Sequence, residues 1–337
     1  MSGPLVLLGH QRPRPRVAEA LAHFGRRGRL AVITAGWRHD EPELDALERD
    51  LGSRLVHLPL YRWFEEVTLD DPGLAAAYHA RQQRIIDYKS AYREQIANAM
   101  GAVADMQARV ARDAELYEPE LRFTHQVLRA IDARALVRVE EIRTGFPATA
   151  RPWDVPSVRR RHDEIAAALR DVDAVLVAGG HVGVLRNRMF FFGLDVLLPQ
   201  ALADGVAVVA WSAGTMALMD RIVLFYDDPP EGPGHAEMFD RGLDLVRGIR
   251  PFPHARQRLR TSDPARMARL VQRLSPAAVV AMEAGAWLEH TDEYGWVDRS
   301  DPDTCWTWNR DGQPCALDSV LPFEAPRTEV GERKVTP

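Results

Sequence analysis

The stretch Val206-Ala-Val-Val-Ala-Trp-Ser-Ala-Gly-Thr215 is the segment of this chain that decides its fold. A run of buried-strand residues ends at the hydroxyl of Ser212, and the small residues Ala213 and Gly214 follow at once. A helical pattern then begins at Thr215. This order is typical of a strand–turn–helix nucleophile elbow, in which a sharp turn lifts the serine oxygen out of a sheet. The simpler alternative is an ordinary strand-to-helix junction with Ser212 as the helix N-cap.

Size and composition indicate a soluble globular protein. The chain has 337 residues, of which 46% are hydrophobic and 27% charged, with a formal net charge of −5. This balance gives no reason to expect nucleic acid as a partner. We expect no membrane segment, since no stretch approaches the roughly 20 apolar residues that a membrane helix needs. The N-terminal apolar run is too short for a signal peptide, and Cys305 and Cys315, the only cysteines, suit a reducing compartment, so we expect a cytoplasmic protein.

Apolar segments alternate with amphipathic ones in the first sixty residues and again after residue 150. Such alternation predicts a doubly wound α/β fold, in which helices cover both faces of a mainly parallel sheet. We expect strands at residues 5–8, 30–36, 54–60, 173–180, 206–210, 222–226, 277–282 and 286–289, a hairpin turn at 309–312, and helices at 16–24, 41–51, 157–169 (capped by Ser157) and 194–203.

The chain has a different pattern between residues 62 and 145, where it is rich in Ala, Arg, Gln and Glu. Apolar side chains from Ile85 to Val110 recur at helical spacing, which predicts a long helix over residues 74–117 and a second over 118–133. We interpret this region as a helical insertion: a hairpin packed on its parent domain, or alternatively a homodimer interface or a lid. The α/β domain would then be discontinuous, formed by residues 1–61 and 146–320, with a poorly ordered tail at 321–337.

A serine nucleophile also needs donors for the oxyanion that forms when it attacks a carbonyl. The pair Gly179-Gly180 follows a predicted strand, and glycines there leave backbone N–H groups free to point into a cleft. The N–H groups of Gly180 and Ala213 are therefore the candidate oxyanion hole. A phosphate-binding turn and a plain tight turn are the alternatives for the glycine pair.

The candidate base is His254, which follows Pro251-Phe-Pro253, because the two prolines stiffen the approach and help to orient the imidazole. His235, in a Gly- and Pro-rich loop, is the rival base. Asp227 or Asp228 is the candidate for the acid that orients the histidine. Paired acids before prolines are also good turn formers, so a structural role is the alternative for these two residues.

The order of these motifs resembles peptidase family S51, the group of aspartyl dipeptidases and cyanophycinases, which has a class I glutamine amidotransferase-like fold. The matching motifs are Gly179-Gly180, Trp211-Ser212-Ala213-Gly214, Asp227-Asp228 and Pro253-His254, and the resemblance covers about residues 1–60 and 150–290. It implies a serine peptidase with a Ser-His-Asp triad. The chain departs from the family at His181, where Asn or Asp is usual, at Ala210, where Gly is usual, and at Thr215, where Ala or Ser is usual. Amidotransferase relatives carry cysteine at the elbow, so Ser212 disfavours glutaminase chemistry.

The first hypothesis is therefore a serine hydrolase that cleaves an amide bond in a small peptide or peptide-like substrate. We expect Gly179, His181, Arg186 and Trp211 to contact the substrate, with Arg186 binding the acidic residue that the resemblance implies. A position on a solvated helix face is an equally good account of Arg186. No Walker motif or dinucleotide fingerprint is present, and the cysteine spacing suits no zinc site, so we expect neither a cofactor nor a metal. The alternatives are a catalytically silent binding or assembly protein that uses the insertion, and a nucleotide-binding protein with phosphate at the glycine pair.

Overall fold

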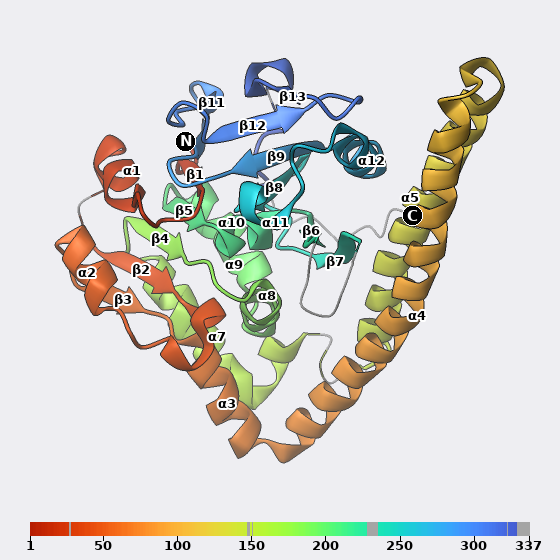
Figure 1. Cartoon of the computed structure of the whole chain (residues 1–337). Helices are drawn as coiled ribbons and strands as arrows, with labels where there is room; N and C mark the ends of the chain where they lie inside the picture. The colour runs from red at the N-terminus through yellow and green to blue at the C-terminus, as the bar shows by residue number, and fades with distance from the viewer. Residues whose placement is uncertain (27, 147–148, 150, 228–234, 322, 329–337) are drawn as a thin grey trace.

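The computed structural model describes residues 1–26, 28–146, 149, 151–227, 235–321 and 323–328. Within these residues the main sheet has the strand order β11-β10-β1-β5-β4-β2-β3 (Figure 1). β1, β5, β4, β2 and β3 run parallel, and β10 and β11 extend one edge in antiparallel fashion. The predicted α/β fold with a mainly parallel sheet is thus confirmed. The strands are β1 (Leu5–Leu8), β2 (Leu30–Ile33), β3 (Leu55–His57), β4 (Ala174–Val177), β5 (Ala207–Trp211), β10 (Trp287–Thr291) and β11 (Gly295–Asp298).

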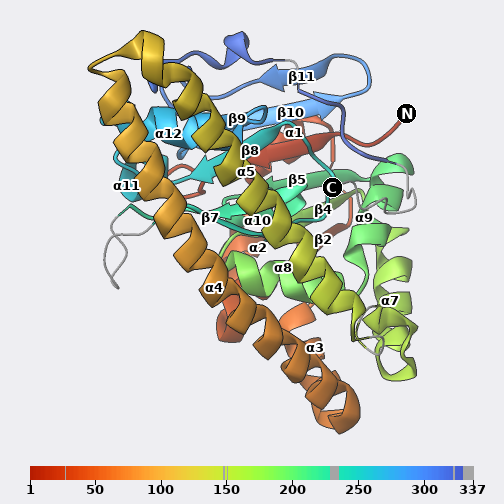
Figure 2. The same ribbon diagram turned by 90° about the vertical axis from the view of Figure 1, so that its right-hand side faces the viewer.

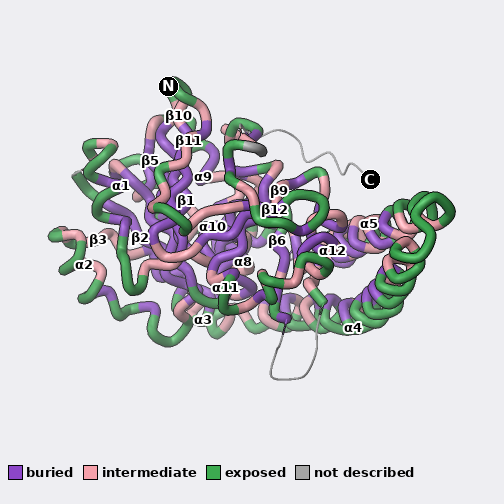
Figure 3. Tube along the Cα trace, turned by 45° about the horizontal axis from the view of Figure 1, so that its top comes forward, coloured by how far each residue is buried: buried purple, intermediate pink, exposed green. Residues whose placement is uncertain are grey.

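Successive strand residues point to opposite faces of this sheet and build two cores, because side chains alternate along a strand. Leu5 and Leu7 pack in one core, whereas Val6 and Leu8 pack in the other, and β2, β4 and β5 divide in the same way. The buried strands appear purple in Figure 3. One face is covered by α3 (Leu60–Asp70), α7 (Pro156–Leu169), α8 (Val182–Phe191) and α9 (Leu194–Ala203), and the other by the short helices α1 (Val17–His23) and α2 (Asp45–Leu51).

A second sheet of order β13-β12-β9-β8 lies beside the first. Its edge strand β8 contains Pro251 and Pro253, which an edge position tolerates because one side of the strand has no ladder to satisfy. The two prolines hid this strand from the sequence pattern. The remaining elements are β6 (Arg221–Leu224), β7 (Glu237–Arg241), β8 (Ile249–Pro253), β9 (Ala278–Met282), β12 (Cys305–Trp308), β13 (Pro314–Cys315), α10 (Ala213–Leu218), α11 (Ala255–Arg258), α12 (Pro264–Leu274) and the 3₁₀ turns η1 (Ala35–Asp40), η2 (Pro152–Asp154) and η3 (Leu317–Ser319).

The predicted insertion is a long hairpin of α4 (Pro72–Val110) and α5 (Ala114–Thr144), which run side by side (Figures 1 and 2). The predicted apolar stripe faces α5 over most of its length, with Tyr92 and Val103 fully buried. The turn between the two helices comes earlier than the boundary that we expected at residue 117. The reason is that the Asp113 carboxylate accepts the Leu116 N–H at 3.1 Å and so caps α5.

A buried ionic cluster fastens this hairpin to the α/β domain. Asp132 of α5 accepts two hydrogen bonds of 2.7 Å from the Arg273 guanidinium of α12. The Tyr92 hydroxyl of α4 donates to Asp132 at 2.6 Å and accepts the Met238 N–H of β7 at 3.1 Å. The side chains of Arg273 and Asp132 are only 2% and 4% exposed, so each charge depends on the other.

Two local expectations differ from the structure. Val155, and not Ser157, occupies the N-cap position of α7, while the Ser157 hydroxyl donates to Asp71 at 2.9 Å. In the tail, where we expected disorder, Phe323 packs on the core, and the Trp296 indole N–H donates to the Glu324 carbonyl at 2.8 Å. Residues 329–337 lie outside the described residues. None of the helices in the described ranges has the length and apolarity needed to cross a membrane.

We predict that Asp132→Ala lowers the free energy of unfolding by about 3–5 kcal/mol, because it leaves the Arg273 guanidinium buried without its anion. The matched control is Arg134→Ala, two residues further along α5, where the Arg134 side chain is 64% exposed and its partner Glu141 is 42% exposed. That change should cost less than about 1 kcal/mol. Urea unfolding followed by circular dichroism measures both, and equal effects would contradict the anchoring role of the buried pair.

Candidate active site

The carboxyl ends of strands from both sheets converge on one cavity of about 680 Å³. Ser212 directly follows β5, Gly179 and Gly180 follow β4, and His10 follows β1. His254 comes from the second sheet, directly after β8. In open α/β sheets, ligands bind outside the carboxyl ends of the strands, so this cavity is the place where the fold favours a site.

Ser212 has the backbone conformation of a nucleophile elbow, with φ 52° and ψ −123°. A residue with a side chain is strained in this region by about 1–3 kcal/mol, and such strain concentrates at functional sites. The surrounding backbones are packed so closely that only glycine fits. A Cβ on Gly214 would lie 2.2 Å from the Val177 carbonyl oxygen, and one on Gly179 would lie 2.9 Å from the Ser212 Cβ.

Two backbone amides beside Ser212 are available as donors. Gly180 has φ 109°, and a Cβ there would lie 2.5 Å from the Gly36 carbonyl oxygen, so glycine is required. Ala213 is the first residue of α10, where a helix leaves its N–H groups without intrahelical acceptors. Among the hydrogen bonds of the described residues, neither the Gly180 nor the Ala213 N–H serves as a donor. The pair thus has the chemistry of an oxyanion hole.

His254 lies face to face with a second histidine. The His10 ring stacks on it with centroids 3.8 Å apart and planes 13° from parallel. Burial, together with the nearby His10 and Arg258, lowers the pKa of His254 to about 4. Burial also lowers the pKa of His10, against the opposing effect of Glu283. Both imidazoles are therefore neutral near pH 7, as a general base must be before it takes a proton.

Glu283 places a carboxylate beside His10, one member of this histidine pair. It directly follows β9, and Pro253 of β8 pairs with Met282 of β9, so the residues after the two strands emerge side by side. One Glu283 oxygen lies 3.9 Å from His10 Nδ1, and the other accepts the Arg256 N–H at 2.8 Å. A negative charge at this point favours the protonated state of a neighbouring imidazole.

The structure gives Asp227 other partners than the expected base. Its carboxylate accepts the Arg260 N–H at 2.7 Å and pairs with the Arg266 guanidinium. With His235, it lines a separate small cavity near α12, and the contacts of the described residues join neither of them to Ser212 or His254. Asp228 lies outside the described residues.

Of the expected substrate-contacting residues, Gly179 and Trp211 line the Ser212 cavity, whereas His181 and Arg186 do not. His181 caps α8, its Nδ1 accepting the Val184 N–H at 3.2 Å. Arg186 is 4% exposed and donates to the Arg241 carbonyl at 2.9 Å. α8 is buried on more than one side, so a basic residue that reads as a surface cation in the sequence is internal in the fold.

His10, Glu283 and the apolar walls of the cavity were missed by the sequence reasoning. A usable signal existed for the first two, since each polar residue comes just after a predicted strand, at the edge where ligands bind. The walls come from α1, η1 and α2, whose apolar residues read as core positions.

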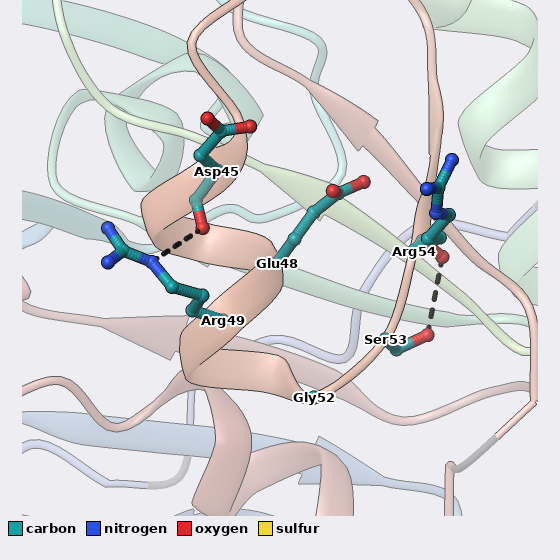
Figure 4. A pocket seen from close by; sticks show the side chains of 6 residues that line it. All are labelled: Asp45, Glu48, Arg49, Gly52, Ser53 and Arg54. Carbon is teal, nitrogen blue, oxygen red and sulfur yellow. Dashed lines mark hydrogen bonds between the residues drawn. The ribbon is translucent and has the colours of Figure 1, made fainter.

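A second cavity, of about 580 Å³, lies at the end of α2 (Figure 4). Arg49 donates to the Asp45 carbonyl and Ser53 to the Arg54 carbonyl, both at 3.2 Å, so these side chains serve the local backbone. In the part of the chain that the structure describes, no group of three or more His, Cys, Asp or Glu side chains could hold a metal ion. The Ser212 cavity is therefore the candidate site.

One comparison, with the models of protein families, matches the part of the chain that contains most of this site. Residues 139–295 match the model of peptidase family S51. None of the curated proteins matches the chain. Among solved structures, a peptidase from an acI-B1 Actinobacterium is similar with 14% identity and a TM-score of 0.46, over 94% of this chain and 95% of that one. The match from residue 139 to residue 295 contains the glycine pair, the Ser212 elbow, His254 and Glu283. Over these residues, the chain is similar to peptidase family S51.

Proposed function

We propose that this protein is a serine hydrolase that cleaves an amide bond in a small peptide or peptide-like substrate. The observation that carries the proposal is the strained elbow: Ser212, at φ 52°, opens into a cavity that His254 and two unused backbone donors also line or border. Strain of this kind persists only where the surroundings enforce it. Here the close backbone packing at Gly36, Gly179 and Gly214 does so. The peptidase family of the segment supports the same reaction class.

In the proposed mechanism, Ser212 Oγ attacks the amide carbonyl while His254 takes its proton. The Gly180 and Ala213 N–H groups donate to the oxyanion of the tetrahedral intermediate. His254 then gives the proton to the leaving amine, and water releases the acyl group by the reverse sequence. Glu283 favours protonation of the stacked histidine pair through its contact with His10, a role that Asp227 is poorly suited to fill because the Arg266 guanidinium and the Arg260 N–H occupy its carboxylate.

We predict that a fluorophosphonate probe labels the wild-type protein at Ser212. Ser212→Ala should abolish labelling, and His254→Ala should slow it by roughly 10²–10⁴-fold, because the hydroxyl loses its base. Ser157→Ala, which removes a hydroxyl remote from the cavity, is the matched control and should label normally. Intact-mass and peptide mass spectrometry measure the adduct. A folded wild-type protein that stays unlabelled would refute the serine nucleophile.

We predict that the acid limb of the pH profile of kcat/KM has its midpoint near pH 4, and not near 6.5, the pKa of an ordinary histidine. Only neutral His254 accepts the serine proton, and its lowered pKa keeps it neutral until the pH falls through about 4. Activity at pH 5.5 should therefore stay close to its value at pH 7.5. His10→Phe keeps a stacking ring but removes a neighbour that lowers this pKa, so its acid limb should move to higher pH. An unchanged limb would show that His10 does not act on His254.

A second candidate role, assembly through the helical hairpin, is favoured by exposed apolar side chains on α5. Leu116 is 59%, Phe123 61% and Val127 42% exposed. Such residues on a projecting arm are suited to contact with a second copy of the chain. If the arm forms a homodimer, Phe123→Glu should shift the sedimentation coefficient from dimer to monomer while Ser212 still labels. A wild-type monomer at all concentrations would rule this role out.

A further inference from the structure

The cavity that begins at Ser212 continues between α1 and α2, and its walls there are apolar. The side chains that form them are Val17, Ala18, Trp37, Leu47, Leu51 and Trp211. They come from four separate elements, α1, η1, α2 and the end of β5. A concave site lined mainly by apolar side chains, with a few polar groups at one end, is the usual form of a small-molecule pocket.

This pocket is an unfilled edge of a hydrophobic core. Trp37, Leu47 and Leu51 are half-buried and pack against the core that contains Trp211 and Val17. α1 and α2 have seven residues each and cover this face of the sheet only in part. Water therefore touches apolar surface that an apolar group could cover, which favours such a group by the hydrophobic effect.

The charged residues around the pocket do not favour the binding of an acidic substrate side chain. Its charged lining residues are Arg12 and Asp50, both exposed and opposite in sign. The neighbouring Arg14 and Arg16 pair with Asp301, and Arg16 also pairs with Glu19. His10 and His254 are neutral near pH 7 because burial lowers the pKa of each.

The cation that the sequence suggested for a substrate carboxylate is also elsewhere. Arg186 is buried beside Asp240 and donates to the Arg241 carbonyl, outside the Ser212 cavity. A carboxylate between the apolar walls loses its hydration, and the cation among the lining residues, Arg12, is exposed and accompanied by the opposite charge of Asp50.

We propose that the pocket receives a bulky apolar side chain, of the size of Leu, Phe or Trp, from the residue on one side of the scissile amide. This inference rests on the proposed function for its chemistry but on different residues for its specificity. All the walls except Trp211 lie before residue 139, outside the segment that matches the peptidase family. The matched segment supplies Ser212 and His254, and the N-terminal segment supplies the substrate preference.

A competition experiment tests the preference directly. Wild-type protein receives an equimolar mixture of the dipeptides X-Ala and Ala-X, with X as Leu, Phe, Ala, Lys, Asp or Glu, and mass spectrometry follows each one. In such a mixture the relative rates equal the ratios of kcat/KM. We expect Leu and Phe to exceed Asp and Glu by at least about 10-fold at one of the two positions. Equal rates, or faster cleavage of the acidic dipeptides at both positions, overturn the inference.

Binding to Ser212→Ala separates this inference from the proposed function, because it needs no turnover. Isothermal calorimetry should find that the better-placed Phe dipeptide binds at least about 10-fold more tightly than its Asp counterpart. If the wild type neither labels nor cleaves but this binding difference holds, the hydrolase proposal fails and the apolar pocket stands. If the Phe dipeptide does not bind, or binds no better than the Asp one, the pocket assignment fails.

Two pairs of variants locate the preference in the pocket. Ala18 is an exposed residue of α1 that lines the cavity, whereas Ala22 is exposed one turn further on and does not line it. Ala18→Phe should reduce cleavage of the Phe dipeptide by about 10-fold, and Ala22→Phe should not. Ala46→Arg, at an exposed cavity position on α2, should raise the Asp-to-Leu ratio by about 10-fold, and its uncharged control Ala46→Met should not. Equal effects within either pair would place the preference elsewhere.

Discussion

The close approach of three backbones around Ser212 is the constraint on which the rest of the site depends. The ends of β2, β4 and β5 meet there, and Gly36, Gly179 and Gly214 each occupy a place where a Cβ would strike a neighbouring carbonyl or side chain. Because these backbones cannot move apart, Ser212 keeps a conformation that a serine otherwise avoids. The same crowding fixes where the Gly180 and Ala213 amides lie. The proposed nucleophile and donors are thus held together by main-chain packing, without help from flexible side chains.

The second sheet contributes the other proposed catalytic groups, His254 and Glu283. His254 and Glu283 follow the adjacent strands β8 and β9, and His10 reaches them from β1 of the main sheet. Gly9 permits this meeting, since a Cβ there would lie 1.8 Å from the Glu283 carbonyl oxygen. The stacked histidines are therefore a contact between two sheets, and burial at this contact keeps both rings neutral.

The sequence predicted the sheet, the elbow and the hairpin because each has a strong local pattern. The run from Val206 to Trp211 and the stripe from Ile85 to Val103 bury the residues that their periods imply. Prediction from the sequence failed where the position of a residue depends on packing against residues far away in the chain. β8 reads as a loop because of its prolines, yet β9 pairs with it. Arg186 reads as a surface cation, yet Asp240 of β7 receives it in the interior. Asp227 stands at a spacing that suits an orienting acid, yet Arg266, from a helix that no short-range pattern connects to it, takes its carboxylate.

Because the proposed site is divided between two sheets, its activity depends on how the two sheets pack against each other. The proposed nucleophile follows β5 and the proposed base follows β8, and these two strands share no hydrogen-bond ladder. A partial opening that leaves both sheets intact would still separate the hydroxyl from the imidazole. Turnover would then disappear while the helical and strand content, and hence the far-ultraviolet spectrum, remained almost native. In this architecture, separation of the two sheets is enough to end turnover, so loss of activity does not require global unfolding.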